Sequence, residues 1–319
     1  MEKPYVMGLD MGGTNSVLGI VDARGHVLAR TSIKTQEYPD IRNYVQALYN
    51  EAVKIIDPLG GMEQIRGIGA GVPDGNYYTG KIEYAPNLPW KGEVPFARLL
   101  SDQFGIPAKI TNDANAAAMG EMTYGAARGM KDFIMITLGT GVGSGIVING
   151  QMVYGYDGFA GELGHTKAVR GANARMCGCG QRGCLEAYTS ANGVARTAKE
   201  IITTSDEPTI LRDLDIDHIT SKDVYDAAVK GDAVAKRIFD FTGRMLGEKF
   251  ADFIAFSSPE AIIMFGGLTK SGDFILKPIV EAMNANVLPH WKDKVKVIFS
   301  DLKESDAAIL GASALAWEL

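Results

Sequence analysis

The sequence predicts an α/β fold, and three observations lead to this prediction. Apolar segments of strand length alternate along the chain with longer segments whose apolar residues recur at helical spacing. An apolar strand followed by a glycine- and threonine-rich turn occurs twice, about 130 residues apart, which indicates a duplicated architecture. The length of 319 residues is sufficient for one large domain or two ordinary ones.

The chain is predicted to start with three consecutive antiparallel strands, at residues 5–10, 17–21 and 26–33. The first is a short apolar run, and the second is again apolar, with a glycine at its centre, as expected for strands. A turn at residues 22–25 separates the second strand from the third. The turn after the first strand is glycine-rich, with Asp10 at the strand end and Gly12 and Gly13 just beyond it.

A helix at residues 41–56 and a strand at residues 65–72 follow. In the helix, apolar residues recur at helical spacing, and Pro58 with two glycines ends it. In the strand, the glycines at positions 67, 69 and 71 all lie on one face. A strand without side chains on one face usually lets another backbone approach closely, so we expect another element against this face.

Residues 73–91 contain several prolines and glycines without clear periodicity. They fit a loop near a functional site and a surface loop without a functional role equally well. A helix at residues 96–104 and a strand at residues 107–111 come next. Asn112 and Asp113 then open a helix, because either residue is a good N-cap and the alanines that follow allow tight packing.

The second half repeats the opening pattern. A strand at residues 133–138 runs into the glycine-rich turn 139–145, and an apolar strand follows. The remaining predicted elements are helices at 191–203, 220–230, 233–256, 274–288 and 307–317, and strands at 260–265 and 295–299. The strand at 260–265 ends at Gly266 and Gly267.

Composition narrows the class of protein. An apolar fraction of 46% and a charged fraction of 22% are ordinary for a soluble globular protein. The net charge of -6 argues against a surface for nucleic acid or acidic membranes, which would need clustered lysines and arginines. We expect no signal peptide and no membrane span, since no sufficiently long apolar run exists. A cytoplasmic location is expected.

The three cysteines, Cys177, Cys179 and Cys184, lie within eight positions, and His165 precedes them. Three thiolates and one imidazole make a complete tetrahedral ligand set for a structural Zn²⁺, which leaves no open position for catalysis. A disulfide is disfavoured, because cysteines two apart do not bridge easily and one thiol would be left over. A lone-thiol or redox role remains as the alternative.

Folding around zinc would hold Glu162 and Glu186 on the same small frame, since they lie close to His165 and Cys184 in the chain. Rigid placement of polar groups is what a selective ligand site needs. The alternative is that both glutamates are only solvated surface.

Glycine-rich turns present backbone amides that bind anions, and threonine hydroxyls add donors. The two turns of this chain would therefore hold a nucleotide triphosphate from both sides. Neither turn matches the Walker pattern or a dinucleotide fingerprint. Asp10 is suited to orienting hydrated Mg²⁺, with simple turn chemistry as its alternative role.

Asp113, at a strand-to-helix junction, is the best candidate for a general base. In phosphoryl transfer the acceptor hydroxyl must be aligned and must lose its proton as the new bond forms, and a carboxylate within hydrogen-bond reach does both. The alternative role is a helix cap.

Several motifs, in this order along nearly the whole chain, resemble the ROK family of sugar kinases and sugar-responsive repressors, within the actin-like ATPase superfamily. They are Asp10-Met-Gly-Gly-Thr14, Asn112-Asp113-Ala-Asn-Ala-Ala, Leu138-Gly-Thr-Gly-Val-Gly-Ser-Gly145, Glu162-Leu-Gly-His165, Cys177-Gly-Cys-Gly-Gln-Arg-Gly-Cys184-Leu-Glu186 and Gly266-Gly267. The cysteine block is the most specific of them.

The resemblance implies a bilobal actin-like (ribonuclease H-like) fold with mixed sheets and an active site between the lobes. We expect a smaller lobe from residues 1–112 and 306–319, and a larger lobe from residues 113–305 that carries the zinc loop and nucleotide-binding elements. It also implies a homodimer.

The resemblance further implies transfer of the γ-phosphoryl group of MgATP to a hexose, commonly to its 6-hydroxyl, with Asp113 as the base. The implied sugar contacts are Asn87, Asn112, Asp113, Glu162, His165 and Glu186, and His165 would also bind zinc. The implied phosphate contacts are Gly12, Gly13, Thr14, Thr140 and Gly141, with Gly266 and Gly267 near the adenosine.

Three other functions compete with hexose phosphorylation. A repressor would need a DNA-binding helix-turn-helix before the first strand, and only nine residues precede Asp10. A sugar sensor without catalysis would be expected to lack the base, which is present as Asp113. A kinase of N-acetylglucosamine, N-acetylmannosamine or another hexose remains open; glucose is preferred because the Glu162, His165 and Glu186 set resembles that of glucokinases.

Overall fold

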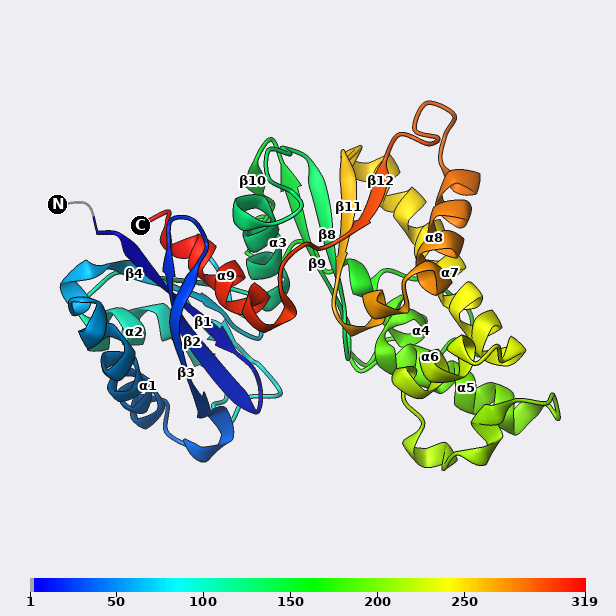
Figure 1. Cartoon of the computed structure of the whole chain (residues 1–319), viewed down its shortest axis with the longest axis horizontal. Helices are drawn as coiled ribbons and strands as arrows, with labels where there is room; N and C mark the ends of the chain where they lie inside the picture. The colour runs from blue at the N-terminus through cyan, green and yellow to red at the C-terminus, as the bar shows by residue number, and fades with distance from the viewer. Residues whose placement is uncertain (1–2) are drawn as a thin grey trace.

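Two five-stranded sheets form the framework of the computed structural model, which describes residues 3–319 (Figure 1). The first sheet has the order β3-β2-β1-β4-β7. Its strands are β1 (Tyr5–Met11), β2 (Asn15–Asp22), β3 (Val27–Lys34), β4 (Ile65–Gly71) and β7 (Ala108–Thr111). The first three are antiparallel neighbours, whereas β4 runs parallel to β1 and β7 runs parallel to β4.

The second sheet repeats this arrangement strand for strand, in the order β10-β9-β8-β11-β12. Its strands are β8 (Phe133–Leu138), β9 (Val142–Ile148), β10 (Gln151–Met152), β11 (Ala261–Phe265) and β12 (Lys296–Phe299). Here too the first three are antiparallel and the last two are added in parallel. The predicted α/β class and the predicted duplication are both confirmed.

Helices α3 (Asp113–Tyr124) and α9 (Glu304–Ala316) lie between the two sheets and pack against each other (Figure 1). Glycines allow this close packing. A Cβ on Gly69 of β4 would overlap the carbonyl oxygen of Ala312 in α9, and a Cβ on Gly120 of α3 would lie 2.8 Å from the Cα of Gly311. The prediction that another backbone lies against the glycine face of residues 65–72 is therefore confirmed.

The remaining helices cover the outer faces of the sheets. They are α1 (Ile41–Ile56) and α2 (Phe96–Phe104) on the first sheet, and α4 (Glu186–Thr189), α5 (Ala191–Thr204), α6 (Ser221–Val229), α7 (Ala233–Ser257) and α8 (Asp273–Asn286) on the second. Successive side chains of the central strands point to opposite faces of the sheet. In β1, Met7 and Leu9 join the core under α1 and α2, whereas Val6 packs with Ile309 and Leu310 of α9.

Several short elements complete the chain. They are the strand pair β5 (Ile82–Glu83) and β6 (Glu93–Val94), and the 3₁₀ turns η1 (Thr35–Glu37), η2 (Asp57–Leu59), η3 (Met62–Gln64), η4 (Leu163–His165), η5 (Ile210–Asp213), η6 (Ile216–His218) and η7 (Gly267–Ser271). The predicted division into residues 1–112 plus 306–319 and residues 113–305 stays a prediction, and its first two residues lie outside the described chain. None of the helices within residues 3–319 combines the length and the hydropathy that a membrane span requires.

Candidate active site

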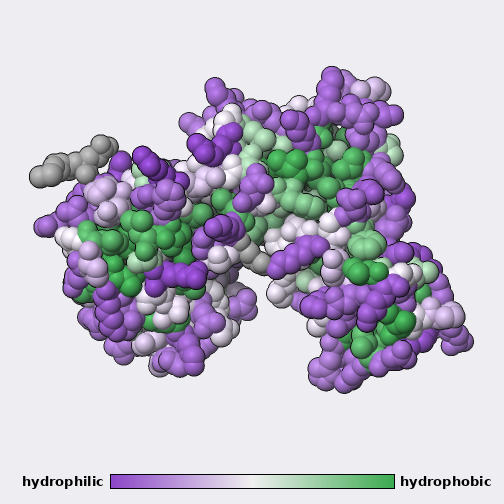
Figure 2. Space-filling model, in the orientation of Figure 1, coloured by the Kyte–Doolittle hydropathy of each residue, from purple (hydrophilic) through white to green (hydrophobic). Residues whose placement is uncertain are grey.

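A cleft separates the part of the molecule built on the first sheet from the part built on the second (Figure 2). It contains a cavity of about 560 Å³ and a neighbouring one of about 510 Å³, and Asp10 and Asp113 line both. The first cavity is also lined by Thr140, Gly141, Glu162, His165, Glu186 and Gly266, and the second by Gly12, Gly13, Thr14 and Asn87. Most of the predicted site residues thus meet in one cleft.

Asp113 is the first residue of α3, and its neighbour Asn112 is the N-cap. The side-chain oxygen of Asn112 accepts a hydrogen bond from the backbone N–H of Asn115 at 2.7 Å. Asp113 accepts one from the N–H of Ala114 at 2.8 Å and keeps its carboxylate open to the cleft. Because Asn112 caps the helix, Asp113 is not needed for that role.

The surroundings in the cleft raise the pKa values of both Asp10 and Asp113. Although its side chain is open to the cleft, the protein walls around Asp113 desolvate its carboxylate, and this raises its pKa above the usual value. Burial, and to a smaller extent the nearby Asp113 carboxylate, raise the pKa of Asp10 to about 6. Raised carboxyl pKa values inside a cleft are typical of functional sites.

Two further carboxylates face this pair. Burial raises the pKa of Glu162, and the negative charges of Asp74, Asp113 and Glu186 add to the effect, while His165 opposes it. Burial and the charge of Asp113 also raise the pKa of Asp74. Asp74 has a φ of +51°, a strained conformation for a residue other than glycine. The sequence placed Asp74 only in a loop of undecided role, so its position beside the site is a finding of the structure.

The two glycine-rich turns reach the cleft from opposite sheets. In the first, the N–H of Gly12 donates to the carbonyl of Asn15 at 2.9 Å, and in the second the N–H of Gly139 donates to the carbonyl of Gly141 at 3.0 Å. Thr14 and Thr140 at their tips are exposed. None of the described residues that line either cavity is a lysine or an arginine. An anion held here would therefore depend on backbone amides, hydroxyls and an added cation.

Asn87 lies against the first of these turns. Its backbone carbonyl accepts a hydrogen bond from the Nε2 of Gln36 at 3.1 Å, and the same amide group donates to the carbonyl of Gly13. Gln36 thus joins the 73–91 loop to the first turn. No local pattern pointed to this residue, because it follows a strand end and belongs to no motif.

Glu186 connects the second turn to the cysteine loop. Its Oε2 accepts a hydrogen bond from the backbone N–H of Val142 at 3.0 Å, and its Oε1 lies 3.3 Å from the Sγ of Cys177. A Cβ on Gly141 would lie 2.5 Å from the Oε2 of Glu186, so a larger residue there would displace this carboxylate. The position of Glu186 is therefore fixed by both the turn and the predicted metal site.

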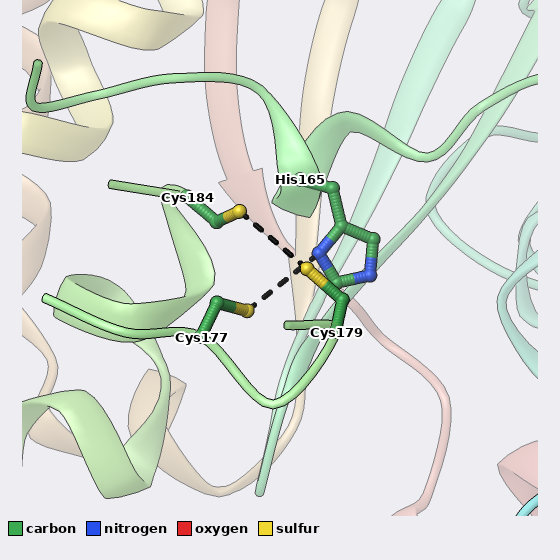
Figure 3. A group of neighbouring side chains, drawn as sticks. All are labelled: His165, Cys177, Cys179 and Cys184. Atoms are coloured by element: carbon green, nitrogen blue, oxygen red, sulfur yellow. Dashed lines mark hydrogen bonds between the residues drawn. The ribbon is translucent and has the colours of Figure 1, made fainter. Parts of the chain in front are cut away.

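The four predicted zinc ligands converge, as Figure 3 shows. One ligand atom from each of His165, Cys177, Cys179 and Cys184 lies within 4.8 Å of the others. The Sγ atoms of Cys179 and Cys184 are 3.7 Å apart, and Cys177 Sγ lies 3.8 Å from the Nδ1 of His165. Two sulfurs on a tetrahedral zinc with Zn–S bonds of about 2.3 Å would be separated by about 3.8 Å. The donor set therefore fits a structural Zn²⁺.

The two ring nitrogens of His165 face different groups. Its Nδ1 faces the sulfurs, whereas its Nε2 lies 3.9 Å from the Oε2 of Glu162. A metal-bound imidazole keeps its second nitrogen for a hydrogen bond, and that nitrogen is directed here toward the cleft carboxylate.

Charged side chains support the cysteine loop. Lys167 places its ammonium 3.7 Å from the Sγ of Cys184, where it offsets negative charge on the thiolates. Arg175 is 7% exposed and donates to Thr197 and Glu200 of α5, with its guanidinium over the ring of Tyr188. These contacts attach the loop to the second sheet's helices.

Two predicted residues lie less directly on the cleft. Gly267 begins η7 and does not line either cavity, although its neighbour Gly266 does. Asn112 does not line either cavity, and its side-chain oxygen is engaged as a cap, which leaves its NH₂ group as the part able to contact a ligand. The roles assigned to the individual site residues stay predictions.

Residues 6–318 match the ROK family. A curated glucokinase from Halalkalibacterium halodurans is 35% identical over 321 residues, which cover 99% of this chain and 96% of that protein. A putative xylose repressor from Caldicellulosiruptor is 26% identical, over 97% of this chain and 77% of its own length.

Among solved structures, a ROK family glucokinase from Streptomyces griseus in complex with glucose and AMPPNP has a TM-score of 0.80 and 32% identity, and covers 99% of this chain and 100% of its own. The match spans the whole framework on which the cleft residues lie. The chain belongs to the ROK family.

Proposed function

We propose that the protein is an ATP-dependent hexose kinase that transfers the γ-phosphoryl group to the 6-hydroxyl of glucose, with Asp113 as the general base. The observation on which this rests is the position of Asp113. Its carboxylate faces a cavity that has Glu162, His165 and Glu186 along one part and the turn with Thr140 and Gly141 along another. A hydroxyl acceptor and a phosphoryl donor can thus meet beside one base.

The chemistry asked of Asp113 is proton removal from the acceptor hydroxyl as the bond to phosphorus forms. Its pKa, raised by burial, brings it closer to the working pH and makes it a better proton acceptor than an ordinary aspartate. Most of the acceleration would come from in-line positioning between the two lobes and from the exclusion of water.

The sugar would be held by carboxylate and amide groups. We assign Asn87, Asn112, Glu162, His165 and Glu186 to its hydroxyls. A carboxylate that a bound ligand covers rejects a ligand that lacks the matching hydroxyl, because the carboxylate would then be desolvated without a partner. The curated and solved relatives named as glucokinases support glucose over other hexoses.

The triphosphate would lie on Gly12, Gly13, Thr14, Thr140 and Gly141, with the adenosine toward Gly266 and Gly267. Since no described lysine or arginine lines the cavities and several carboxylates do, the phosphate charge requires a cation. Asp10 is placed to hold hydrated Mg²⁺, which would neutralise charge on the phosphates. Zn²⁺ on His165 and the three cysteines would fix the loop that carries Glu186, without a part in the chemistry.

The test is ADP release with MgATP over a panel of glucose, fructose, mannose, allose, N-acetylglucosamine and N-acetylmannosamine, with the product phosphorylation site assigned by NMR. We expect glucose to have the highest kcat/KM and to yield the 6-phosphate. A preference for an N-acetylhexosamine would change the assigned substrate and leave the assigned reaction, phosphoryl transfer from ATP to a sugar, unchanged. No turnover of any sugar by protein with a full zinc content would refute the kinase proposal.

We also propose that the enzyme is a cytoplasmic homodimer, which agrees with thiol ligands that must stay reduced and with the prevalence of symmetric dimers. Light scattering after size-exclusion chromatography tests the dimer, since a monomer mass at working concentration would contradict it.

A further inference from the structure

Two loops from opposite sides of the cleft meet each other through side-chain contacts. The first runs from Pro73 to Lys81, after β4, and the second spans residues 153–162, between β10 and η4. They carry cleft carboxylates: Asp74 is near the start of the first loop and Glu162 is at the end of the second. The relative position of these loops therefore sets the spacing of two groups that face the sugar end of the cleft.

Asn76 is the polar side chain that joins them. It is 2% exposed, and its Nδ2 donates to the backbone carbonyl of Asp157 in the second loop at 2.7 Å. Its Oδ1 accepts from the backbone N–H groups of Tyr78 and Thr79, at 3.0 and 3.2 Å, and so shapes the first loop. One amide therefore performs two separable tasks, a local one through oxygen and a cross-cleft one through nitrogen.

The opposing loop is shaped to receive this amide. Gly158 has a φ of +93°, and a Cβ there would lie 2.5 Å from the Oδ1 of Asn76, so the close approach depends on glycine. Beside it, the rings of Tyr77 and Tyr154 stack with centroids 4.0 Å apart and planes 9° apart. Because Asn76 is buried, its Nδ2 group would be costly to leave without a partner.

The second loop is fixed at its other end by Ser144 of β9. The hydroxyl of Ser144 donates to the carbonyl of Gly161 and accepts from the N–H of Leu163 at 3.0 Å, on either side of Glu162. The second loop is thus held from its own sheet by Ser144, on either side of Glu162, and from the opposite sheet by Asn76, at Asp157.

We propose that Asn76 is a positioning residue for the sugar: its Nδ2 bond to Asp157 sets the distance across the cleft between the loop of Asp74 and the loop of Glu162. This deepens the proposed function and rests on it for the sugar. Asn76 itself does not line either cavity, so it acts through the carboxylate-bearing loops. Loss of this hydrogen bond should weaken the binding of the sugar. It should not weaken the binding of MgATP, which the glycine-rich turns would hold.

Asn76→Asp separates the two tasks. Its carboxylate still accepts from Tyr78 and Thr79 but has no N–H to donate to Asp157, whereas Asn76→Ala loses both tasks. Thr79→Val is the matched control, because the hydroxyl of Thr79, which valine removes, bonds on its own side of the cleft, to the side chain of Glu83 and the backbone N–H of Lys81. We expect both Asn76 variants to raise the KM for glucose about tenfold with an unchanged KM for MgATP, and Thr79→Val to leave both KM values unchanged.

Hydrogen–deuterium exchange supplies a readout that does not need turnover. Exchange in residues 153–162 should rise in both Asn76 variants and not in Thr79→Val. If wild type turns over no sugar, the proposed function fails while the exchange result still decides whether the loops are coupled. If wild type is active but Asn76→Asp keeps the wild-type KM and exchange, the inference is overturned and the function stands. Equal increases in both KM values would also overturn it, because they would mark a general loss of structure.

Discussion

Asp10→Asn should stabilise the protein while it abolishes activity, because Asp10 is held in an unfavourable charged state. Burial, and then the neighbouring carboxylate of Asp113, raise its pKa from 3.8 to about 6 in the folded protein. Between about pH 4 and pH 6 the folded protein retains this proton while the unfolded chain has released it. The stability therefore falls as the pH rises through this window, and the loss is complete above about pH 6.

The magnitude follows from the size of the shift. A rise of about two pKa units corresponds to roughly 3 kcal/mol of lost stability at neutral pH. Asparagine is nearly the same size and carries no charge, so it removes this loss. We expect Asp10→Asn to be more stable than wild type by up to about 3 kcal/mol at pH 8, and equal to it near pH 4.

Urea unfolding in magnesium-free buffer at pH 4.5 and pH 8 measures this difference; the midpoint at pH 8 should rise by on the order of 1 M. Asp223→Asn is the control with the opposite sign. Hydrogen bonds from the side chain and backbone of Thr220 lower the pKa of Asp223, so its replacement should reduce stability at pH 8. An Asp10→Asn variant less stable than wild type at pH 8 would refute the assignment of Asp10 as a strained functional carboxylate.

Three further predictions test other parts of the structure. Cys184→Ser should lower the bound zinc, measured by mass spectrometry, from about one ion per chain to near zero. It should also raise the KM for glucose, because the position of Glu186 depends on the metal loop. Full retention of zinc would contradict the four-ligand site. Gly69→Ala should lower the unfolding free energy by at least about 2 kcal/mol, since the added methyl group would overlap the carbonyl of Ala312. Gly139→Ala is the control and should have no such effect, because a Cβ there meets no atom within 4 Å. Equal effects would show that α9 does not need the close approach. Since burial raises the pKa of Asp113, kcat/KM should fall on acidification with an apparent pKa above that of a free aspartate, and a flat profile down to pH 4 would argue against Asp113 as the base.

Local patterns were enough to predict most of the fold. Helix α1 has the predicted bounds, because an apolar stripe begins after the capping residue Asp40 and ends before Pro58. The repeated strand–turn–strand pattern led to the duplicated sheets. By contrast, α9 starts at residue 304 and not at the predicted 307, because its first turn is polar and shows no apolar spacing. The short elements β10 and α4 were missed, since two and four residues carry no periodicity.

The same distinction holds for the site. The metal cluster and Asp113 were predictable because their partners lie close in sequence or at a recognisable strand–helix junction. Asp74, Gln36 and Asn76 were not singled out as site residues, because their contacts join segments separated by up to 81 residues. Such contacts depend on how the loops cross the cleft, which no local pattern records.

The proposed role of Asp113 is tested most directly by Asp113→Asn, measured in two ways. Isothermal titration calorimetry gives the affinity for glucose, and ADP release with MgATP gives kcat. Because asparagine keeps the shape and loses only the ability to accept a proton as a base, we expect kcat to fall by about 10² to 10⁴ with a glucose affinity within about tenfold of wild type. A variant that binds glucose and retains kcat within a factor of about ten would contradict Asp113 as the general base.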